Sequence, residues 1–248
     1  MNNYVFEICA NSAESAVQAQ LGGAQRVELC AGIPEGGTTP SFGEIMTSLK
    51  YTNIDINVII RPRAGDFLYT ERELEIMECD IELIRETGIR SVVFGCLTAD
   101  GDVDTVAMTR LMKHCKGLSV TFHRAFDVCR NPQLALEQII DLGCNRILTS
   151  GQQPDAQQGI PLIRKLVEQA GKRIIIMPGC GINETNIGKI ATETGANEFH
   201  MSARSLYPSS MIYKNPRVSM GGTVVIDEYK QPITDAEKVR RTIAILNN

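Results

Sequence analysis

Eight short β-rich runs recur along the chain, with starts 22 to 35 residues apart. That interval holds a strand and a returning helix. The runs lie at residues 4–9, 26–30, 56–63, 91–97, 118–124, 146–151, 173–179 and 198–203. Because repeated βα units build parallel sheets, eight of them predict an α/β fold, a single (β/α)8 TIM barrel over residues 1–248. A doubly wound open sheet is the rival, but the G-x-G-x-x-G signal after the first run is missing.

Helical patterns fill the intervals between the runs. They cover residues 12–21, 70–87, 102–116, 131–142, 155–170 and 183–194, with one more after residue 234. Thr70 and Glu73 predict a capping box, and Thr234 with Glu237 predicts the same start for the last helix. Two connections, 31–40 and 204–232, are too long to be simple turns. We expect the second to be a long loop between the eighth strand and the last helix, serving as a lid or an interface.

The composition excludes several classes of protein. The 248 residues carry a formal charge of −4 and no block of Lys and Arg, so we expect no nucleic-acid partner. No apolar run approaches the roughly 20 residues of a membrane span, and the first residues lack the features of a signal peptide. We therefore expect the protein neither to cross a membrane nor to bind one. Eight cysteines occur without a CxxC pair or zinc-type spacing, which favours a reduced protein in the cytoplasm.

The fifth run ends in charged residues. Its letters LSVTFHRAFD pass from apolar positions to His123, Arg124 and Asp127. A parallel strand is buried on both faces, and ligands bind where such strands end. Since side chains alternate along a strand, His123 should face inward with Thr121, and Arg124 should face away. We therefore expect His123 at the centre of a site, with Arg124 and Asp127 as supporting partners.

The ends of other runs add polar residues to the same mouth of the barrel. They supply Glu7, Glu28, Arg61, Arg63, Ser150, His200 and Ser202. Together with His123, the carboxylates and imidazoles of this set are candidates for a general base and a general acid. Arg61 and Arg63 would hold an anionic substrate, because guanidinium groups pair with carboxylate or phosphate. The alternative is an internal layer of salt bridges that closes the top of the barrel.

Two metal interpretations stand beside acid–base chemistry. The imidazoles and carboxylates at the mouth are ligand types for a divalent metal, although they are dispersed in the sequence. Separately, Cys9 and Cys30 close two adjacent strands with matching inward parity. Two thiolates so placed would suit Cu(I). The alternative is a pair of buried thiols that only line the barrel.

Glycines after the seventh run indicate an anion site. Gly179 and Gly181 in MPGCGIN allow backbone N–H groups to face an anion, with a helix N-terminus behind them. Barrels often bind phosphate after strands 7 and 8, where Ser202 also lies. The same glycines equally serve an ordinary tight turn. No lysine lies at the exit of a run, which argues against a Schiff-base aldolase.

Several long strings resemble one known family. ELC and EGGTTPS, then IRPRAGDF, VFGCL, VTFHRAFD, RILTSG and EFHMSAR, are similar to the copper homeostasis protein CutC family over residues 6–204. The resemblance implies a cytoplasmic TIM barrel that is implicated in copper homeostasis. It also implies a homo-oligomer, which we expect to be a dimer or a tetramer. By the same resemblance, Cys9 and Cys30 match the family's proposed copper thiols. No reaction carries over with it.

The resemblance extends to the mouth and fails at two turns. The matching polar cluster is Glu7, Glu28, Arg61, His123 and Arg124. Ala64 stands where glycine usually follows IRPR in the family, and it would be strained if that turn needs positive φ. Cys180 stands in the glycine turn after the seventh run, which weakens a tight anion cradle there.

Two functions therefore stand side by side. In the first, the protein binds Cu(I) through Cys9 and Cys30. In the second, it is an enzyme acting on a small anionic, for example phosphorylated, substrate, with Glu7 or Glu28 as base and His123 as acid. The thiol pair favours the first function, and the surplus of arginines, histidines and carboxylates favours the second.

Overall fold

The computed structural model describes residues 4–221 and 226–247, and eight parallel strands form its centre. These are β1 (Val5–Ala10), β2 (Arg26–Leu29), β3 (Asp55–Ile59), β4 (Ser91–Phe94), β5 (Ser119–Phe122), β6 (Arg146–Thr149), β7 (Ile175–Pro178) and β8 (Glu198–Met201). From β1 to β7 each strand pairs with the next one along the chain, and β8 returns to pair with β1. The predicted TIM barrel is therefore confirmed.

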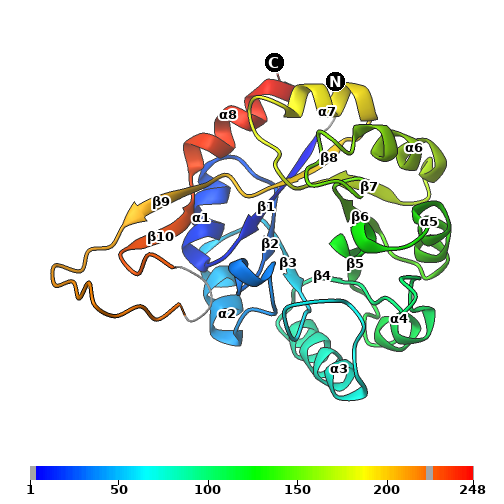
Figure 1. Ribbon diagram of the computed structural model, residues 1–248, viewed down its shortest axis with the longest axis horizontal. Coiled ribbons are helices and arrows are strands. Elements are labelled where there is room, and N and C mark those ends of the chain that lie inside the picture. Colours follow the sequence, from blue (N-terminus) through cyan, green and yellow to red (C-terminus); the bar gives the residue numbers. More distant parts are fainter. Residues whose placement is uncertain (1–3, 222–225, 248) are drawn as a thin grey trace.

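The barrel is nearly closed. β7 and β8 lie next to each other, but among the described residues no ladder of hydrogen bonds joins them. Figure 1 shows the strands around a common centre, with the helices on the outside. Because all eight strands point the same way, their carboxyl ends open at one mouth.

Helices follow the strands in the expected alternation. They are α1 (Ala13–Leu21), α2 (Phe42–Tyr51), α3 (Glu71–Glu86), α4 (Thr105–Met112), α5 (Pro132–Asp141), α6 (Ile160–Ala170), α7 (Ile187–Thr194) and α8 (Ala236–Asn247), with short 3-10 turns η1 (Ile33–Glu35) and η2 (Arg124–Val128). α2 is the helix that the sequence patterns missed. Its start carried a signal, because the Ser41 hydroxyl accepts a hydrogen bond from the Glu44 N–H.

The structure tests the two predicted helix caps and the expected strain at Ala64. The capping box of Thr70 and Glu73 is present at the start of α3. The predicted cap at Thr234 is wrong. Thr234 ends a strand, and the Asp235 carboxylate accepts hydrogen bonds from the N–H groups of Glu237 and Lys238 at the start of α8. Ala64 is not strained, because the positive φ of that turn falls on Gly65.

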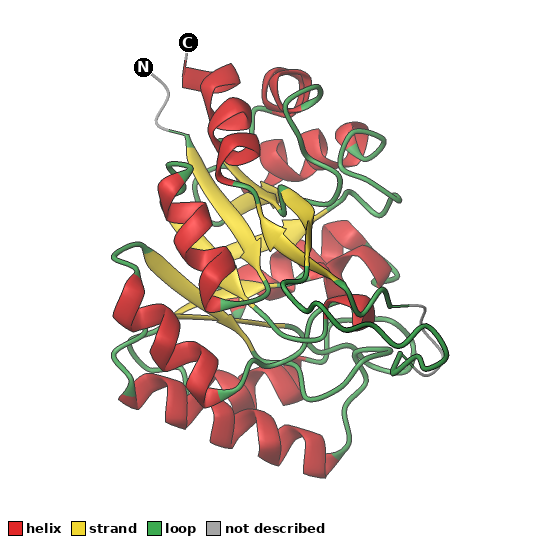
Figure 2. Cartoon of the chain, turned by 90° about the vertical axis from the view of Figure 1, so that its left-hand side faces the viewer, coloured by secondary structure: helices red, strands yellow, loops and turns green. Residues whose placement is uncertain are grey.

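The connection 204–232 is not simply a loop. Its two ends pair as antiparallel strands, β9 (Arg204–Pro208) and β10 (Lys230–Thr234). We call the described residues of this segment, 204–221 and 226–234, the arm. Figure 1 shows the arm extending away from the barrel beyond α1, and Figure 2 views the chain from that side, with the barrel strands enclosed by helices.

The outer and inner faces of the barrel strands differ in chemistry. Outward side chains such as Phe6, Ile8 and Phe199 are fully buried beneath the helices. Several inward side chains are charged yet also buried, among them Glu7 and Arg26. Since buried charges must be paired, the barrel interior contains a polar network, and the mouth is built on top of it.

Candidate metal centre and cavity at the barrel mouth

A buried ion-pair network forms the floor of the site. The Arg26 guanidinium binds the carboxylates of Glu7 and Glu198, and its contact with Glu198 is 2.6 Å long. Arg146 reaches the same Glu198 oxygen at 2.7 Å, and the Asn57 amide donates to Glu7 at 2.7 Å. This layer differs from the expected one, since it lies below the mouth instead of closing it and includes only Glu7 of the polar residues expected there. Glu7 belongs to this floor and does not line the space above it.

A cavity of about 500 Å³ opens above the floor, at the carboxyl ends of the strands. Most of the expected site residues line it, namely Cys9, Glu28, Cys30, Arg61, His123, Arg124, Asp127, Gly181, His200 and Ser202. Its wall also includes apolar side chains such as Phe67, Leu148 and Ile182. Glu7, Arg63, Ser150 and Gly179 do not line it, in contrast to their expected place at the mouth.

Cys9 and Cys30 lie together at this mouth. Their sulfurs are 3.5 Å apart, although in the strand register Cys9 is the direct partner of Glu28. The two cysteines share the inward parity expected of them and are diagonal neighbours across β1 and β2. The Arg204 guanidinium donates to the Cys9 sulfur at 3.0 Å and to the Cys9 carbonyl at 3.1 Å.

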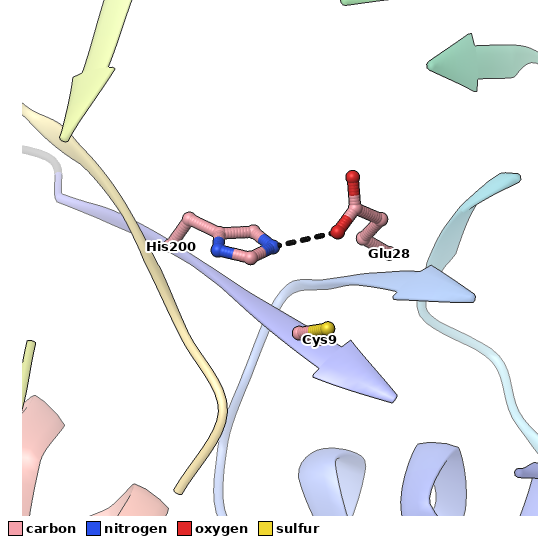
Figure 3. A group of neighbouring side chains, drawn as sticks. All are labelled: Cys9, Glu28 and His200. Carbon is pink, nitrogen blue, oxygen red and sulfur yellow. Dashed lines mark hydrogen bonds and ion pairs between the residues drawn. The ribbon is translucent and has the colours of Figure 1, made fainter. Parts of the chain in front are cut away.

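Glu28 and His200 complete a cluster around Cys9. The His200 Nε2 and a Glu28 carboxylate oxygen are 2.9 Å apart (Figure 3). One ligand atom from each of Cys9, Glu28 and His200 lies within 4.8 Å of the other two. The barrel brings these three together because β1 lies between β2 and β8. The imidazoles and carboxylates expected as ligands of a divalent metal, those of His123, His200, Glu7 and Glu28, do not all come together in this cluster.

The charge states of the cluster follow from its contacts. The hydrogen bond from Cys30 lowers the pKa of Cys9 to about 6, since it outweighs the opposing effect of burial, and His200 adds to the lowering. The same pairing and burial raise the pKa of Cys30. Burial alone would lower the pKa of His200, but the Glu28 carboxylate and Cys9 hold it well above its usual value. The cluster therefore favours a thiolate beside an imidazolium–carboxylate pair.

His123 occupies the cavity wall as a neutral imidazole. Burial lowers the pKa of His123 to about 4. Its Nδ1 accepts a hydrogen bond from the Ala125 N–H at 3.3 Å, and its ring packs against Phe67 in a tilted arrangement with centroids 4.8 Å apart. Because Nδ1 is the acceptor, Nε2 carries the proton, and among the described residues Nε2 has no partner.

The two arginines expected to clamp an anion behave differently. Arg61 lines the cavity, but its terminal nitrogens donate to the carbonyls of Glu35, Gly37 and Gly65. Arg63 turns away and pairs with Glu73 at 2.5 Å. The two arginines diverge because β3 ends at Ile59, and the alternation that would place both side chains on one face of the strand stops there.

Arg124 and Asp127 form an ion pair that connects the segments following β5 and β6. Their side chains are 2.8 Å apart, and Asp127 also accepts from the Thr149 hydroxyl at 2.5 Å and the Ser150 N–H at 3.0 Å. Ser150 takes part in these contacts through its N–H group, which agrees with a supporting role for Asp127. Both Arg124 and Asp127 nevertheless reach the cavity lining.

The glycine turn after β7, expected to bind an anion, does not lead directly into a helix. Cys180 and Gly181 adopt positive φ, but α7 begins only at Ile187. The N–H groups of the turn therefore do not run on into a helix N-terminus, as the anion interpretation requires. Arg204, by contrast, was missed as a site residue, although the string HMSAR placed it at the end of the eighth run.

Comparison with known proteins identifies the family of the chain. The CutC family model matches residues 4–205. The chain belongs to the CutC family. A CutC family protein of Parabacteroides distasonis is 64% identical over 96% of this chain and 99% of its own length. The human copper homeostasis protein cutC homolog is 48% identical over 100% of this chain and 90% of its own length.

Solved structures agree with this CutC assignment. A crystal structure of a copper homeostasis protein CutC from Streptococcus agalactiae has a TM-score of 0.77 and 36% identity, over 80% of this chain and 98% of that one. Thiamine phosphate pyrophosphorylase from Pyrococcus furiosus has a TM-score of 0.57 at 14% identity, over 99% and 96% of the two chains. That second likeness shows the fold alone. None of the described helices is long and apolar enough to cross a membrane.

Proposed function

We propose that this CutC protein binds Cu(I) at the barrel mouth through Cys9 and Cys30. The observation that carries the proposal is the 3.5 Å separation of the two sulfurs at the wall of an open cavity. Thiolates are the soft ligands that Cu(I) prefers. The names of the relatives, which refer to copper homeostasis, support the same metal.

The placement of the cysteines suits an ion better than a disulfide. Cys30 is two residues beyond Glu28, the register partner of Cys9. Such an offset separates backbone positions by roughly 8 Å in a flat sheet, beyond the roughly 7 Å that a disulfide spans. A metal ion bound between two sulfurs holds them further apart than an S–S bond does, and so spans a longer distance. Once the incoming ion displaces its proton, His200 supplies a third donor of suitable softness, while the Glu28 oxygen is a harder ligand that holds His200 in place.

An anaerobic Cu(I) titration against a competing chelator tests the proposal. We expect one tightly bound ion in the wild type and a loss of affinity of more than about 100-fold in Cys9→Ser/Cys30→Ser, which exceeds the effect of removing an outer-shell partner. Cys96→Ser is the matched control, because Cys96 is as buried as Cys30 but does not line the cavity. Tight binding of one ion by the double variant would overturn the proposal.

A second candidate function is supported by the size of the cavity. A volume of about 500 Å³ is far more than one ion needs and matches the range of small-molecule sites. Among the described residues, Nε2 of His123 and Nε of Arg61 and Arg204 are buried without a hydrogen-bond partner. These donors suit a small anionic substrate, with Glu28 as base and His123 as electrophile or acid.

Inorganic phosphate and small carboxylates are the probes for this second function. Titration calorimetry should detect binding to the wild type and not to His123→Phe, which keeps an aromatic ring but removes the donor. His114→Phe is the control, because His114 pairs with Glu82 on the outer helices. Equal binding by both variants would remove His123 from the site.

We also place the protein in the cytoplasm. All eight cysteines are free thiols, a state that a reducing compartment maintains. Fractionation of cells that produce the protein checks this placement.

A further inference from the structure

We propose that the cavity at the barrel mouth binds an amphipathic anion, with a singly charged head at His123 and an apolar tail in a second recess beside the cavity. The inference rests on the second function proposed above, because it takes the anion site at the mouth as given. It adds the chemical class of the ligand and a subsite for its tail.

The ionised groups of the cavity lining favour a head with one negative charge. The lining holds four cations, which are Arg61, Arg124, Arg204 and the His200 imidazolium. It holds three anions, which are Glu28, Asp127 and the Cys9 thiolate. Because a charge that leaves water must be compensated, a single negative charge suits this lining. A carboxylate carries that charge, whereas a phosphate monoester carries about −1.5 to −2 at pH 7.

His123 offers a hydrogen-bond donor for this head. Its Nδ1 faces the wall of the cavity, since the Ala125 N–H donates to Nδ1 and a Cβ on Gly95 would lie 3.0 Å from that atom. The Nε2 side of the ring faces away from this wall, and Nε2 is buried without a partner among the described residues. A buried donor without a partner is costly, and an anionic head that accepts its hydrogen bond removes this cost.

The recess beside the cavity is largely apolar. It has a volume of about 430 Å³, and residues 65–68, 97–99, 101 and 128 line it. Phe67 and Val128 line both spaces and so form the edge between them. Among the described residues that line the recess, only Asp66 carries a charge, and Asp66 pairs with Arg63 at 2.9 Å. Such a recess suits the apolar part of a ligand whose polar part is bound elsewhere.

The sites for the head and the tail are adjacent. The ring of Phe67 is 4.8 Å from that of His123, measured between centroids, and 5.1 Å from the guanidinium carbon of Arg61. The recess lies at the ends of β3, β4 and β5, whereas the cluster around Cys9 lies across the mouth, at β1, β2 and β8 (Figure 1). A tail attached to a head at His123 therefore passes over Phe67 into the recess. The other side of the head is then turned towards Glu28, the proposed base.

Titration calorimetry of the full chain with acetate, butyrate and hexanoate tests the tail. Each methylene that leaves water should raise the affinity about fourfold, so we expect hexanoate to bind on the order of 100-fold more tightly than acetate. Hexanamide has a similar tail but no charge, and it should bind about tenfold more weakly than hexanoate. Equal affinities for acetate and hexanoate would overturn the inference and leave anion binding in place. No binding of acetate, hexanoate or inorganic phosphate would overturn both the inference and the second function.

Variants of the recess locate the tail. Leu68→Asn/Val128→Asn makes two exposed apolar side chains of the recess polar, so the barrel should stay folded. Leu83→Asn/Val106→Asn is the matched control, because it makes the same change at exposed positions of α3 and α4. The measured quantity is the ratio of the hexanoate affinity to the acetate affinity within each protein. We expect this ratio to fall about tenfold in the recess variant and to stay unchanged in the control. A recess variant that keeps the wild-type ratio would place the tail elsewhere and refute the subsite.

Discussion

Cys9 is surrounded by partners with opposing effects on its thiol. Cys30 and His200 stabilise the thiolate, while burial and the Glu28 carboxylate disfavour it. Arg204 adds a direct contact with the sulfur. Because Cys30 has the largest effect, the two thiols act as a pair in which Cys9 carries the negative charge and Cys30 keeps its proton. A low thiol pKa of this kind is what makes a cysteine a good ligand or nucleophile at neutral pH.

Replacement of Cys30 should therefore change the titration of Cys9. We expect Cys30→Ala to raise the pKa of Cys9 from about 6 towards its ordinary value. The thiolate fraction at pH 7 would then fall from about nine tenths to a minor share. The measurement is the rate of Cys9 alkylation as a function of pH. Cys115→Ala, a buried cysteine of the helical layer, should leave the curve in place; an unchanged curve for Cys30→Ala would show that Cys30 is not the dominant partner.

At the scale of elements, the points where strands end decide which side chains meet. β3 ends at Ile59, so Arg61 and Arg63 diverge instead of sharing a face. β5 ends at Phe122, and His123 then caps η2 through its Nδ1. The sequence patterns located every barrel strand and all the helices except α2. They extended strands past their ends because polar residues at the mouth still alternate with apolar ones.

The connection between β6 and α6 gives a prediction about close packing. Gly159 has an ordinary helical φ of −79°, yet an added Cβ would collide with the Ser150 carbonyl oxygen. We expect Gly159→Ala to lower the free energy of unfolding by about 1–3 kcal/mol, the usual cost of overpacking. Gly43→Ala in α2 is the comparison, since a Cβ there has room and should stabilise by about 0.5 kcal/mol. Urea unfolding measures both, and an unaffected Gly159→Ala would mean that the loop relaxes freely.

At the scale of the whole molecule, burial of His123 makes stability depend on pH. In the folded chain the pKa of His123 is about 4, whereas in the unfolded chain it is about 6.5. Between these values the unfolded state binds the extra proton, so stability is highest above pH 6.5 and falls as the pH drops towards 4. The loss from this residue is about 3 kcal/mol.

Urea unfolding at pH 7 and pH 4 checks this dependence. We expect His123→Gln to lose much less stability over this interval than the wild type. His114→Gln should behave like the wild type, because His114 lies on the outside of the barrel. Equal losses in His123→Gln and the wild type would assign the acid sensitivity to other groups.

The amino-acid sequence by itself determined the barrel and the chemistry available at its mouth. Spaced apolar runs and capping residues are local signals, and eight of them in a row leave few alternatives to a closed parallel sheet. Only the tertiary structure decided which polar groups meet. Closure of the barrel sets β8 beside β1, so His200 reaches Glu28 over 172 positions and Arg204 reaches Cys9 over 195. It also sends Glu7 to the floor, because buried charges must find partners wherever the fold places them.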